Sequence, residues 1–372
     1  MPWLRLVDRL VEWRTVRRAL RGSRANIRAV RETRVLEVTH ALDEARGAIG
    51  AGDPARALAI WTQLQAERPK ELLRNPTAYE VLLDLGKFDE AETFTAEAYN
   101  RAGPTRSRLE ARAVVAQRRN ATSDAILRWQ EVRRKFPEFP MGYVQCAVCL
   151  TAVGRSADAE TLLAQAAKRF PEDVFAQVEF ARLAADRADW PAAVQRWGAV
   201  RVRFDAAIGV SGTAQALREM GQLDEAEAVL LAALPAHPID LGISIELALV
   251  AGRKGDTAQA LLRWHEVRRK FPQCWLGYWE ETNLLRAAGR MDDAEAALRE
   301  AVDRLPLDPD PAREFAQFAA ARLDWPEAMA RWAAFRKAFP NRPEGYEHGA
   351  EALVAIGRTE EAAQLRATTP LI

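Results

Sequence analysis

One alanine position recurs along most of the chain and constrains its fold more than any other feature. Between consecutive members of this series of ten alanines the residue number rises by 34, and once by 33, and we call the series the alanine ladder. A small side chain is needed where two helices approach closely, because a larger one would push their axes apart. The ladder therefore predicts a series of similar helical units rather than one large core. Its members are Ala57, Ala91, Ala125, Ala159, Ala193, Ala226, Ala260, Ala294, Ala328 and Ala362.

Three further positions recur in step with the ladder. Twelve residues before each ladder alanine stands another alanine in eight units, whereas the other two units have Tyr79 and Thr282 there. The eight alanines are Ala45, Ala113, Ala147, Ala181, Ala214, Ala248, Ala316 and Ala350. Five residues before it stands a turn residue, replaced by Asn120, Ala188 and Leu323: Gly52, Gly86, Gly154, Gly221, Gly255, Gly289 and Gly357. Twelve residues after it stands a proline, which Asp205 replaces and Pro104 misses by one: Pro69, Pro137, Pro171, Pro238, Pro272, Pro306 and Pro340.

These positions predict two helices per unit. Glycine supplies the left-handed conformation that ends a helix, since it has no Cβ to clash. The later proline ends the second helix, because it cannot donate the next backbone hydrogen bond. Aspartates stand where they can cap the second helix by accepting a hydrogen bond from its first turn. These are Asp53, Asp189, Asp256 and Asp324.

A unit of this length and helix–turn–helix pattern resembles the tetratricopeptide repeat. The resemblance covers residues 38–372, as about nine full repeats and a truncated tenth, and leaves residues 1–37 as a basic amphipathic N-terminal segment or cap. It implies an all-α fold, a tetratricopeptide-type helix–turn–helix solenoid that coils as a right-handed superhelix. We expect the repeats to begin near residues 38, 72, 106, 140, 174, 207, 241, 275, 309 and 343.

Large aromatic residues alternate between the repeats. Tryptophans occupy the second helix of the odd units only, and their numbers rise by 68, 68, 67 and 68 along the column: Trp61, Trp129, Trp197, Trp264 and Trp332. The even units carry at this position Thr95, Leu163, Leu230 and Leu298. Tyrosines open three even units: Tyr143, Tyr278 and Tyr346. We therefore expect each Trp to be buried and the solenoid to consist of paired, 68-residue units. Where the next unit opens with a Tyr, the Trp can pack beside it.

Charge disfavours nucleic acid as a partner. The chain has 53 basic and 52 acidic residues, so no strong overall field attracts a polyanion. The local basic stretches Arg133–Lys135 and Arg268–Lys270 each end a helix just before a proline, where cations favour the negative end of the helix dipole. We interpret them mainly as parts of the repeat, although a spaced basic stripe is an alternative.

The sequence contains no recognisable catalytic or metal-binding motif. It lacks a P-loop, a nucleotide-binding glycine motif, HExxH and GxSxG, and its four histidines lie in different repeats. Cys146 and Cys149 form a single CxxC within a helical stretch, which indicates two small core residues rather than a zinc or redox site. We expect no enzyme activity, cofactor or metal.

The first helices of such an array line a groove, and their helical phase directs a set of polar and aromatic residues into it. An exposed Trp among Arg and Asn suits an extended peptide, because it combines an aromatic anchor with charge-assisted hydrogen bonds. The candidate groove residues are Arg118, Arg182, Arg218, Arg253, Trp279, Asn283 and Arg286. Solvated helix faces would explain the same residues.

The N-terminal segment is a second candidate surface. Residues 1–37 carry ten Arg against four acidic residues, arranged around an apolar stripe. Such a basic amphipathic helix suits an anionic membrane surface or a partner groove, and it would equally cap the first repeat. The docking residues would be Trp3, Arg5, Leu6, Arg9, Leu10, Trp13, Arg14 and Arg17.

The sequence thus favours a non-catalytic protein–protein interaction scaffold or adaptor that binds an extended partner segment in its groove. One alternative is a peripheral membrane adaptor anchored by residues 1–24. Another is an auxiliary subunit of an envelope-polysaccharide or glycosyl-transfer system, by analogy with similar Trp-alternating repeats in bacteria. With no signal peptide, we expect a cytoplasmic protein, or one at the periphery of the inner membrane. Only seven of the 53 basic residues are Lys, a bias typical of GC-rich bacterial genomes.

Overall fold

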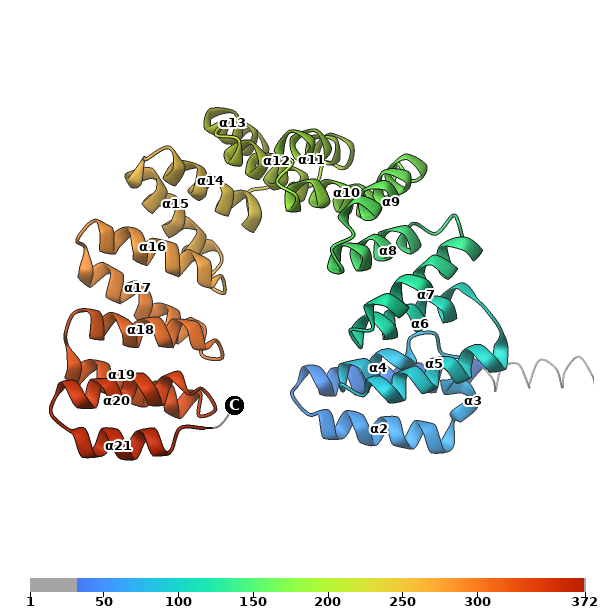
Figure 1. Ribbon diagram of the computed structural model, residues 1–372, viewed down its shortest axis with the longest axis horizontal. Coiled ribbons are helices and arrows are strands. Elements are labelled where there is room, and N and C mark those ends of the chain that lie inside the picture. The colour runs from blue at the N-terminus through green and yellow to red at the C-terminus, as the bar shows by residue number, and fades with distance from the viewer. Residues whose placement is uncertain (1–31, 371–372) are drawn as a thin grey trace, which may run out of the picture. The chain divides into compact units, whose positions relative to one another are not determined.

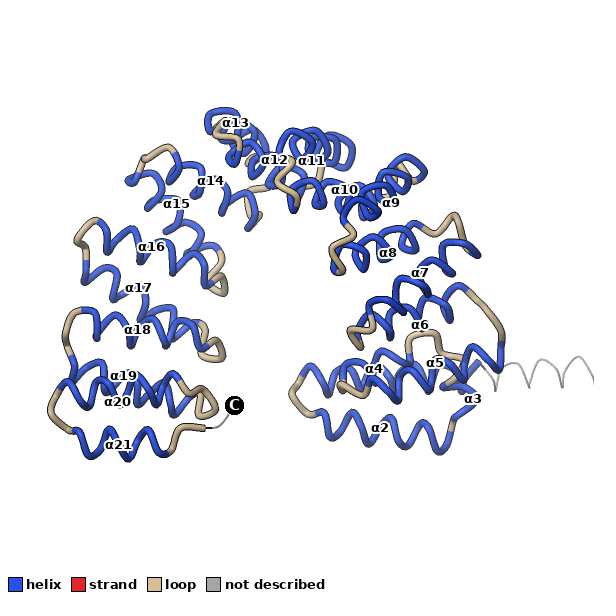
Figure 2. Tube along the Cα trace, viewed as in Figure 1, coloured by secondary structure: helices blue, strands red, loops and turns tan. Residues whose placement is uncertain are grey.

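The computed structural model describes residues 32–370, and they are helical with no strand among them (Figure 2). A helical segment over residues 32–50 comes first. It is followed by α2 (Pro54–Glu67), α3 (Pro69–Leu72), α4 (Ala78–Asp84), α5 (Phe88–Ala102), α6 (Arg106–Arg118), α7 (Thr122–Lys135), α8 (Pro140–Ala152), α9 (Ser156–Arg169), α10 (Val174–Asp186), α11 (Trp190–Phe204), α12 (Ala207–Glu219), α13 (Leu223–Ala233), α14 (Leu241–Arg253), α15 (Thr257–Lys270), α16 (Trp275–Ala287), α17 (Met291–Arg304), α18 (Pro309–Ala321), α19 (Trp325–Ala338), α20 (Glu344–Ala355) and α21 (Thr359–Ala367).

The chain forms two compact units, Met1–Phe180 and Ala181–Ile372, with the boundary inside α10. Within each unit, successive helices pack in pairs, as in α6 with α7 or α14 with α15 (Figure 1). Apart from the single turn α3, each expected repeat therefore supplies two helices. The first helical segment includes residues 32–37, which the sequence had placed in the N-terminal segment.

The alanine ladder marks the crossings of helices, as predicted. All ten ladder alanines have an exposed fraction of 0%. The eight alanines twelve residues earlier in each unit are equally buried, and the exceptions Tyr79 and Thr282 are also buried. Because eight of the ten units bury an alanine on each of two facing helices, these helices can pack at close range.

The turn position ends the first helix in a left-handed conformation in every repeat. The seven glycines of this column have φ between +71° and +85°. The three replacements follow the same path although they carry a Cβ: φ is 58° at Asn120, 55° at Ala188 and 60° at Leu323. The turn geometry is thus set by the helix pair, and the residue conforms to it at a cost in strain.

The predicted aspartate caps are confirmed. In each case the carboxylate accepts a hydrogen bond from the backbone N–H three residues later, at 3.0 Å from Arg56 to Asp53 and 2.9 Å from Gln259 to Asp256. Asp189 and Asp324 make the equivalent bonds to Ala192 and Glu327.

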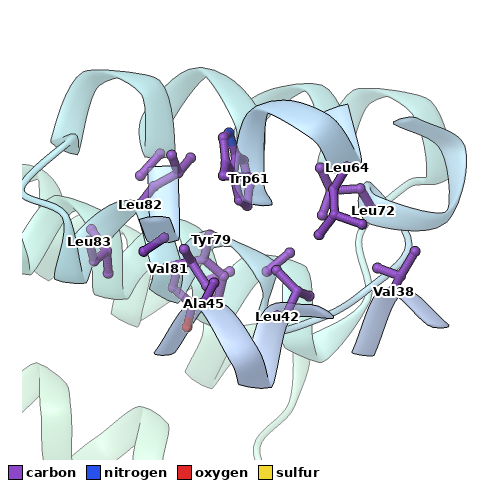
Figure 3. Close-up of a cluster of buried hydrophobic side chains, with 14 of the residues drawn as sticks. Val38, Leu42, Ala45, Trp61, Leu64, Leu72, Tyr79, Val81, Leu82 and Leu83 are labelled. Atoms are coloured by element: carbon purple, nitrogen blue, oxygen red, sulfur yellow. The ribbon is translucent and has the colours of Figure 1, made fainter. Parts of the chain in front are cut away.

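The tryptophan column is buried, with exposed fractions between 1% and 5%. Figure 3 shows Trp61 of α2 above Leu42 and Ala45 of the first helical segment and beside Leu82 of α4. The expected Trp–Tyr packing is wrong at Trp264, which packs with Val267 and Phe271, while Tyr278 belongs to a neighbouring cluster.

Hydrogen bonds from the hydroxyl groups orient the tyrosine rings. Tyr278 donates a hydrogen bond to the carbonyl of Pro272 at 3.3 Å, and Tyr143 donates to Pro137 at 3.3 Å. A phenol that is buried needs a polar partner, so the ring turns towards the helix-ending proline rather than the Trp.

Glycines bring α12 very close to α11. A Cβ built on Gly209 would lie 2.5 Å from the backbone nitrogen of Arg201, and one on Gly212 would lie 2.4 Å from the indole of Trp197. The connection between the two helices is also short, because Asp205 and Ala206 alone separate Phe204 from Ala207. This joint coincides with the single shorter step of the ladder.

We expect Leu323→Gly to stabilise the protein by about 0.5–1 kcal/mol, because it relieves left-handed strain and the replaced side chain is 70% exposed. The midpoint of urea unfolding should rise. The reciprocal change Gly255→Ala, at φ +79° with no atom near the new Cβ, should lower it by a similar amount. An unchanged midpoint in both variants would contradict the assigned strain.

Gly209→Ala should destabilise the second unit by about 1–3 kcal/mol, since the Cβ meets the backbone of α11 and the helices must separate. Gly198→Ala is the matched control, because this helical glycine has no atom within 4 Å of a new Cβ and should be neutral or stabilising. Both effects can be measured by chemical unfolding. Equal stability of the two variants would disprove the close contact.

Candidate binding face

Arg268, the first cation of the basic stretch at the end of α15, is engaged within the fold. The guanidinium of Arg268 pairs with Glu281 at 2.6 Å and with Glu300 at 2.6 Å. It also lies over the ring of Tyr278, 5.7 Å from the ring centre. Arg133 stands over Tyr143 in the same way, at 5.4 Å. These cations therefore serve the contacts between repeats, as the interpretation of the basic stretches predicts.

The arginine that precedes each of two tryptophans ties consecutive repeats together. Arg128 donates to Glu92 of the preceding repeat at 2.8 Å and to the carbonyl of Arg112 at 2.8 Å. Arg331, which precedes Trp332 in the second unit, pairs with Glu295 from the corresponding place. Half-buried ion pairs that also satisfy a backbone carbonyl orient neighbouring helices.

The cysteine pair is buried on α8. Cys146 and Cys149 are 1% and 2% exposed, and burial raises the pKa of both thiols, that of Cys149 to about 11. Within residues 32–370, no group of three or more His, Cys, Asp or Glu side chains could hold a metal ion. Two buried, protonated thiols are inert core residues.

Three of the expected groove residues share one face of α16. Trp279, Asn283 and Arg286 stand four and three residues apart, which places them along one side of a helix. Trp279 is half-buried and its ring lies 6.0 Å from that of Trp275. The guanidinium of Arg286 lies 5.7 Å from the ring centre of Phe318 on α18. This side of α16 therefore presents an aromatic pair followed by an amide and a cation.

Arg218 departs from the expected role of a ligand-facing cation. It is only 8% exposed and donates to the carboxylates of Glu246 at 2.9 Å and Glu219 at 2.5 Å. Burial disfavours its charge, but the two carboxylates keep its pKa above the usual value. Burial raises the pKa of Glu246, and Arg218 opposes that rise. The spacing on the helix could not reveal this, because the acid that holds Arg218 comes from the next repeat.

The other predicted cations are exposed and spread over several helices. Arg253 lies at the end of α14, 3.5 Å from Glu219, so it joins the same network as Arg218. Arg182 is exposed on α10. Arg118, in the other unit, is exposed and 3.8 Å from Asp84. The structure thus places Arg182, Arg218 and Arg253 on the successive first helices α10, α12 and α14 of one unit.

A hollow of about 320 Å³ opens between the first helices α10, α12 and α14. Its lining combines polar and apolar groups: Arg182, Trp197, Ser211, Gln215, Ile245 and Glu246. Only Arg182 was expected from the sequence. The usable signal was Gly212, which stands where α8 carries Gln145, whereas Gly209 recurs in other repeats as Gly142, Gly277 and Gly345.

The N-terminal candidates lie outside the described residues: Trp3, Arg5, Leu6, Arg9, Leu10, Trp13, Arg14 and Arg17. In the part of the chain that is described, no helix is long and apolar enough to cross a membrane.

Comparison with known protein families agrees with the repeat geometry. A family model described as tetratricopeptide repeat matches residues 178–239 and 245–309. The matched ranges contain four of the ten ladder alanines, with their left-handed turns and paired helices. The chain contains tetratricopeptide repeats. No curated protein matched the chain.

Several solved structures are similar to this tetratricopeptide repeat protein. A tetratricopeptide repeat protein from Parabacteroides merdae is 15% identical, with 67% of this chain and 98% of that chain covered and a TM-score of 0.45. Yeast Tom70 is 13% identical, with 88% and 90% covered and a TM-score of 0.46. A thermophilic tetratricopeptide repeat protein from Thermus thermophilus is 22% identical, with 49% and 99% covered and a TM-score of 0.40.

This architecture is that of a protein-interaction scaffold. Its first helices carry two groups of partly exposed polar and aromatic side chains, the α16 face and the lining of the hollow at α12.

Thiol labelling tests the assignment of the cysteines. In the native tetratricopeptide repeat protein at pH 8, a thiol reagent should react with Cys274, which is half-buried, much faster than with Cys146 or Cys149. A pKa of about 11 leaves roughly a thousandth of the Cys149 thiol ionised at this pH. All three should react after unfolding in denaturant. Native labelling of three thiols at equal rates would contradict their burial.

Proposed function

We propose that this tetratricopeptide repeat protein is a non-catalytic scaffold that binds an extended segment of a partner protein along its first helices. The single observation that carries the proposal is the face of α16, where Trp279, Asn283 and Arg286 lie on one side of the helix. Aromatic residues and arginine are the side chains that most often dominate binding energy at protein interfaces.

The contacts of this face suit a ligand that brings both apolar and acidic groups. Trp279 is held by Trp275 at 6.0 Å, so its ring is ordered before a partner arrives and loses little freedom on binding. Arg286 rests over the ring of Phe318, a contact that leaves the N–H donors at the edge of its guanidinium available for an acidic group. The neighbouring carboxyl of Glu314 has a pKa raised by burial, an effect that Arg313 and Arg286 oppose.

The ion pairs between repeats reduce the number of arginines that are available to bind a partner. Arg128, Arg268 and Arg331 are engaged by carboxylates and contribute to the joints of the array. The cations of the first helices Arg182 and Arg253 are more exposed, and we expect them to extend the α16 face for an acidic segment of the partner.

The double variant Trp279→Ala, Arg286→Ala tests the proposal by affinity capture of partners from the source cell. We expect recovery of the partner to fall at least about tenfold, because two anchors of this kind contribute on the order of 2 kcal/mol or more. Unfolding curves should stay near those of the original protein, since both side chains are partly exposed.

The matched control is Leu262→Ala, Arg269→Ala, which also removes one exposed apolar and one exposed Arg side chain, but from the second helix α15. Its recovery should be unchanged. Undiminished recovery with the α16 variant, or equal loss with both variants, would move the binding surface elsewhere.

The membrane adaptor remains a second proposal. The observation in its favour is the sequence pattern of residues 1–24, in which arginines surround an apolar stripe. Such a segment would hold the array at an anionic surface while the first helices bind the partner.

A further inference from the structure

The indole of Trp129 shows how this repeat satisfies a buried N–H group. Its Nε1 donates to Oε1 of Gln117 on α6 at 3.2 Å. The amide nitrogen of Gln117 in turn donates to Oε1 of Gln145 on α8, also at 3.2 Å. One side-chain amide thus accepts from the indole and donates to an acceptor on the next repeat.

The equivalent tryptophan two repeats later, Trp197, has neither of the two glutamines that follow Trp129 in this chain of hydrogen bonds. Trp197 follows Trp129 in the tryptophan column, and Ala185 stands at the same offset from Gln117. Gly212 takes the place of Gln145, one position earlier in register because of the shorter step. Trp197 is 5% exposed, and its Nε1 is buried with no hydrogen-bond partner among the described residues. A buried donor without an acceptor costs free energy, so this one needs an explanation.

The missing side chains coincide with the hollow on α10, α12 and α14. Ala185, Gly212 and Trp197 all line it. The space cannot be filled from α12, because a Cβ at Gly212 would lie 2.4 Å from the indole ring. The close approach of α11 and α12 therefore keeps an indole donor unpaired beside an open space.

The polar groups around this space select a neutral amide. Glu246 also lines the hollow, and Arg218 holds its carboxylate in place at 2.9 Å. Asp186 adds a second acid to the lining. Arg182 is the cation of this lining, so two acids face one base there. The two acids disfavour a ligand carboxylate, whereas an amide offers an acceptor for the indole and a donor for the carboxylate of Glu246.

We propose that this hollow binds the side-chain amide of a glutamine from the partner, with its oxygen accepting from Trp197 Nε1 and its nitrogen donating to Glu246. The bound amide takes the place that Gln117 occupies at Trp129. This site rests on the proposed function, because it adds a specificity pocket to the same first-helix face. The hollow binds one glutamine of the partner segment, and Trp279 on the α16 face provides the aromatic anchor for the same segment.

The test follows the indole N–H signals of the full chain by NMR during titration with propionamide, and separately with propionate. Propionamide is the free analogue of the glutamine side chain, and propionate is its acidic counterpart. We expect propionamide to shift the Trp197 signal and leave that of Trp129 unchanged, because Gln117 already satisfies Trp129. Propionate should have no such effect. Absence of a shift with propionamide, or a larger shift with propionate, would overturn the proposal.

Two variants fill the hollow from within the chain. Ala185→Gln should restore the internal acceptor, slow the exchange of the Trp197 indole proton by about fivefold, and abolish its response to propionamide. Ala185→Met fills a similar volume without an amide and should block propionamide without slowing exchange. Equal exchange rates in the two variants would show that the indole does not face this space.

These measurements involve no partner protein, so they are independent of affinity capture. A response of Trp197 together with unchanged capture by the α16 variant would retain the amide pocket and reject the α16 face. Loss of capture by the α16 variant without a response of Trp197 to propionamide would retain the α16 face and reject the amide pocket.

Discussion

The whole architecture depends on the close contact of two helices in each repeat, which in eight of the ten repeats is made at a pair of alanines. All ten ladder alanines are fully buried, and a side chain longer than methyl at this point would separate the axes. Once the helices are this close, the turn between them must be tight, and its central residue must be left-handed. Leu323 and Ala188 accept that conformation at a cost, which shows that helix packing dominates over the preference of the turn residue.

The same packing explains why arginine and glutamate side chains form ion pairs between neighbouring repeats. Each repeat contacts only its neighbours, so polar side chains at the joints must find partners across them. Arg128 with Glu92, and Arg268 with Glu281 and Glu300, meet this need. Arg268, which belongs to an apparent basic patch in the sequence, is therefore part of the joint between repeats.

The joint between α11 and α12 is where the regular pattern is broken. One residue is missing from the spacing, proline is replaced by Asp205, and Gly212 stands where the corresponding helix α8 carries Gln145. Each change permits or follows from a closer approach of the two helices. The result is a hollow beside Trp197 that the regular repeat at Trp129 fills with its own amides. This departure from the repeat therefore leaves a polar group unsatisfied that the joint at Trp129 satisfies internally.

By itself the sequence determined the all-α class, the period, the buried alanines and tryptophans, the turn positions and the aspartate caps. These features are local or recur at fixed spacing, so helical geometry within one unit is enough to predict them. It did not determine the pairing of Arg218 with Glu246, the turn of Tyr278 away from Trp264, or the hollow at Trp197. Those depend on which side chains meet across repeats, where distances of a few ångströms between separate helices decide whether a polar group is buried, paired or open to a partner.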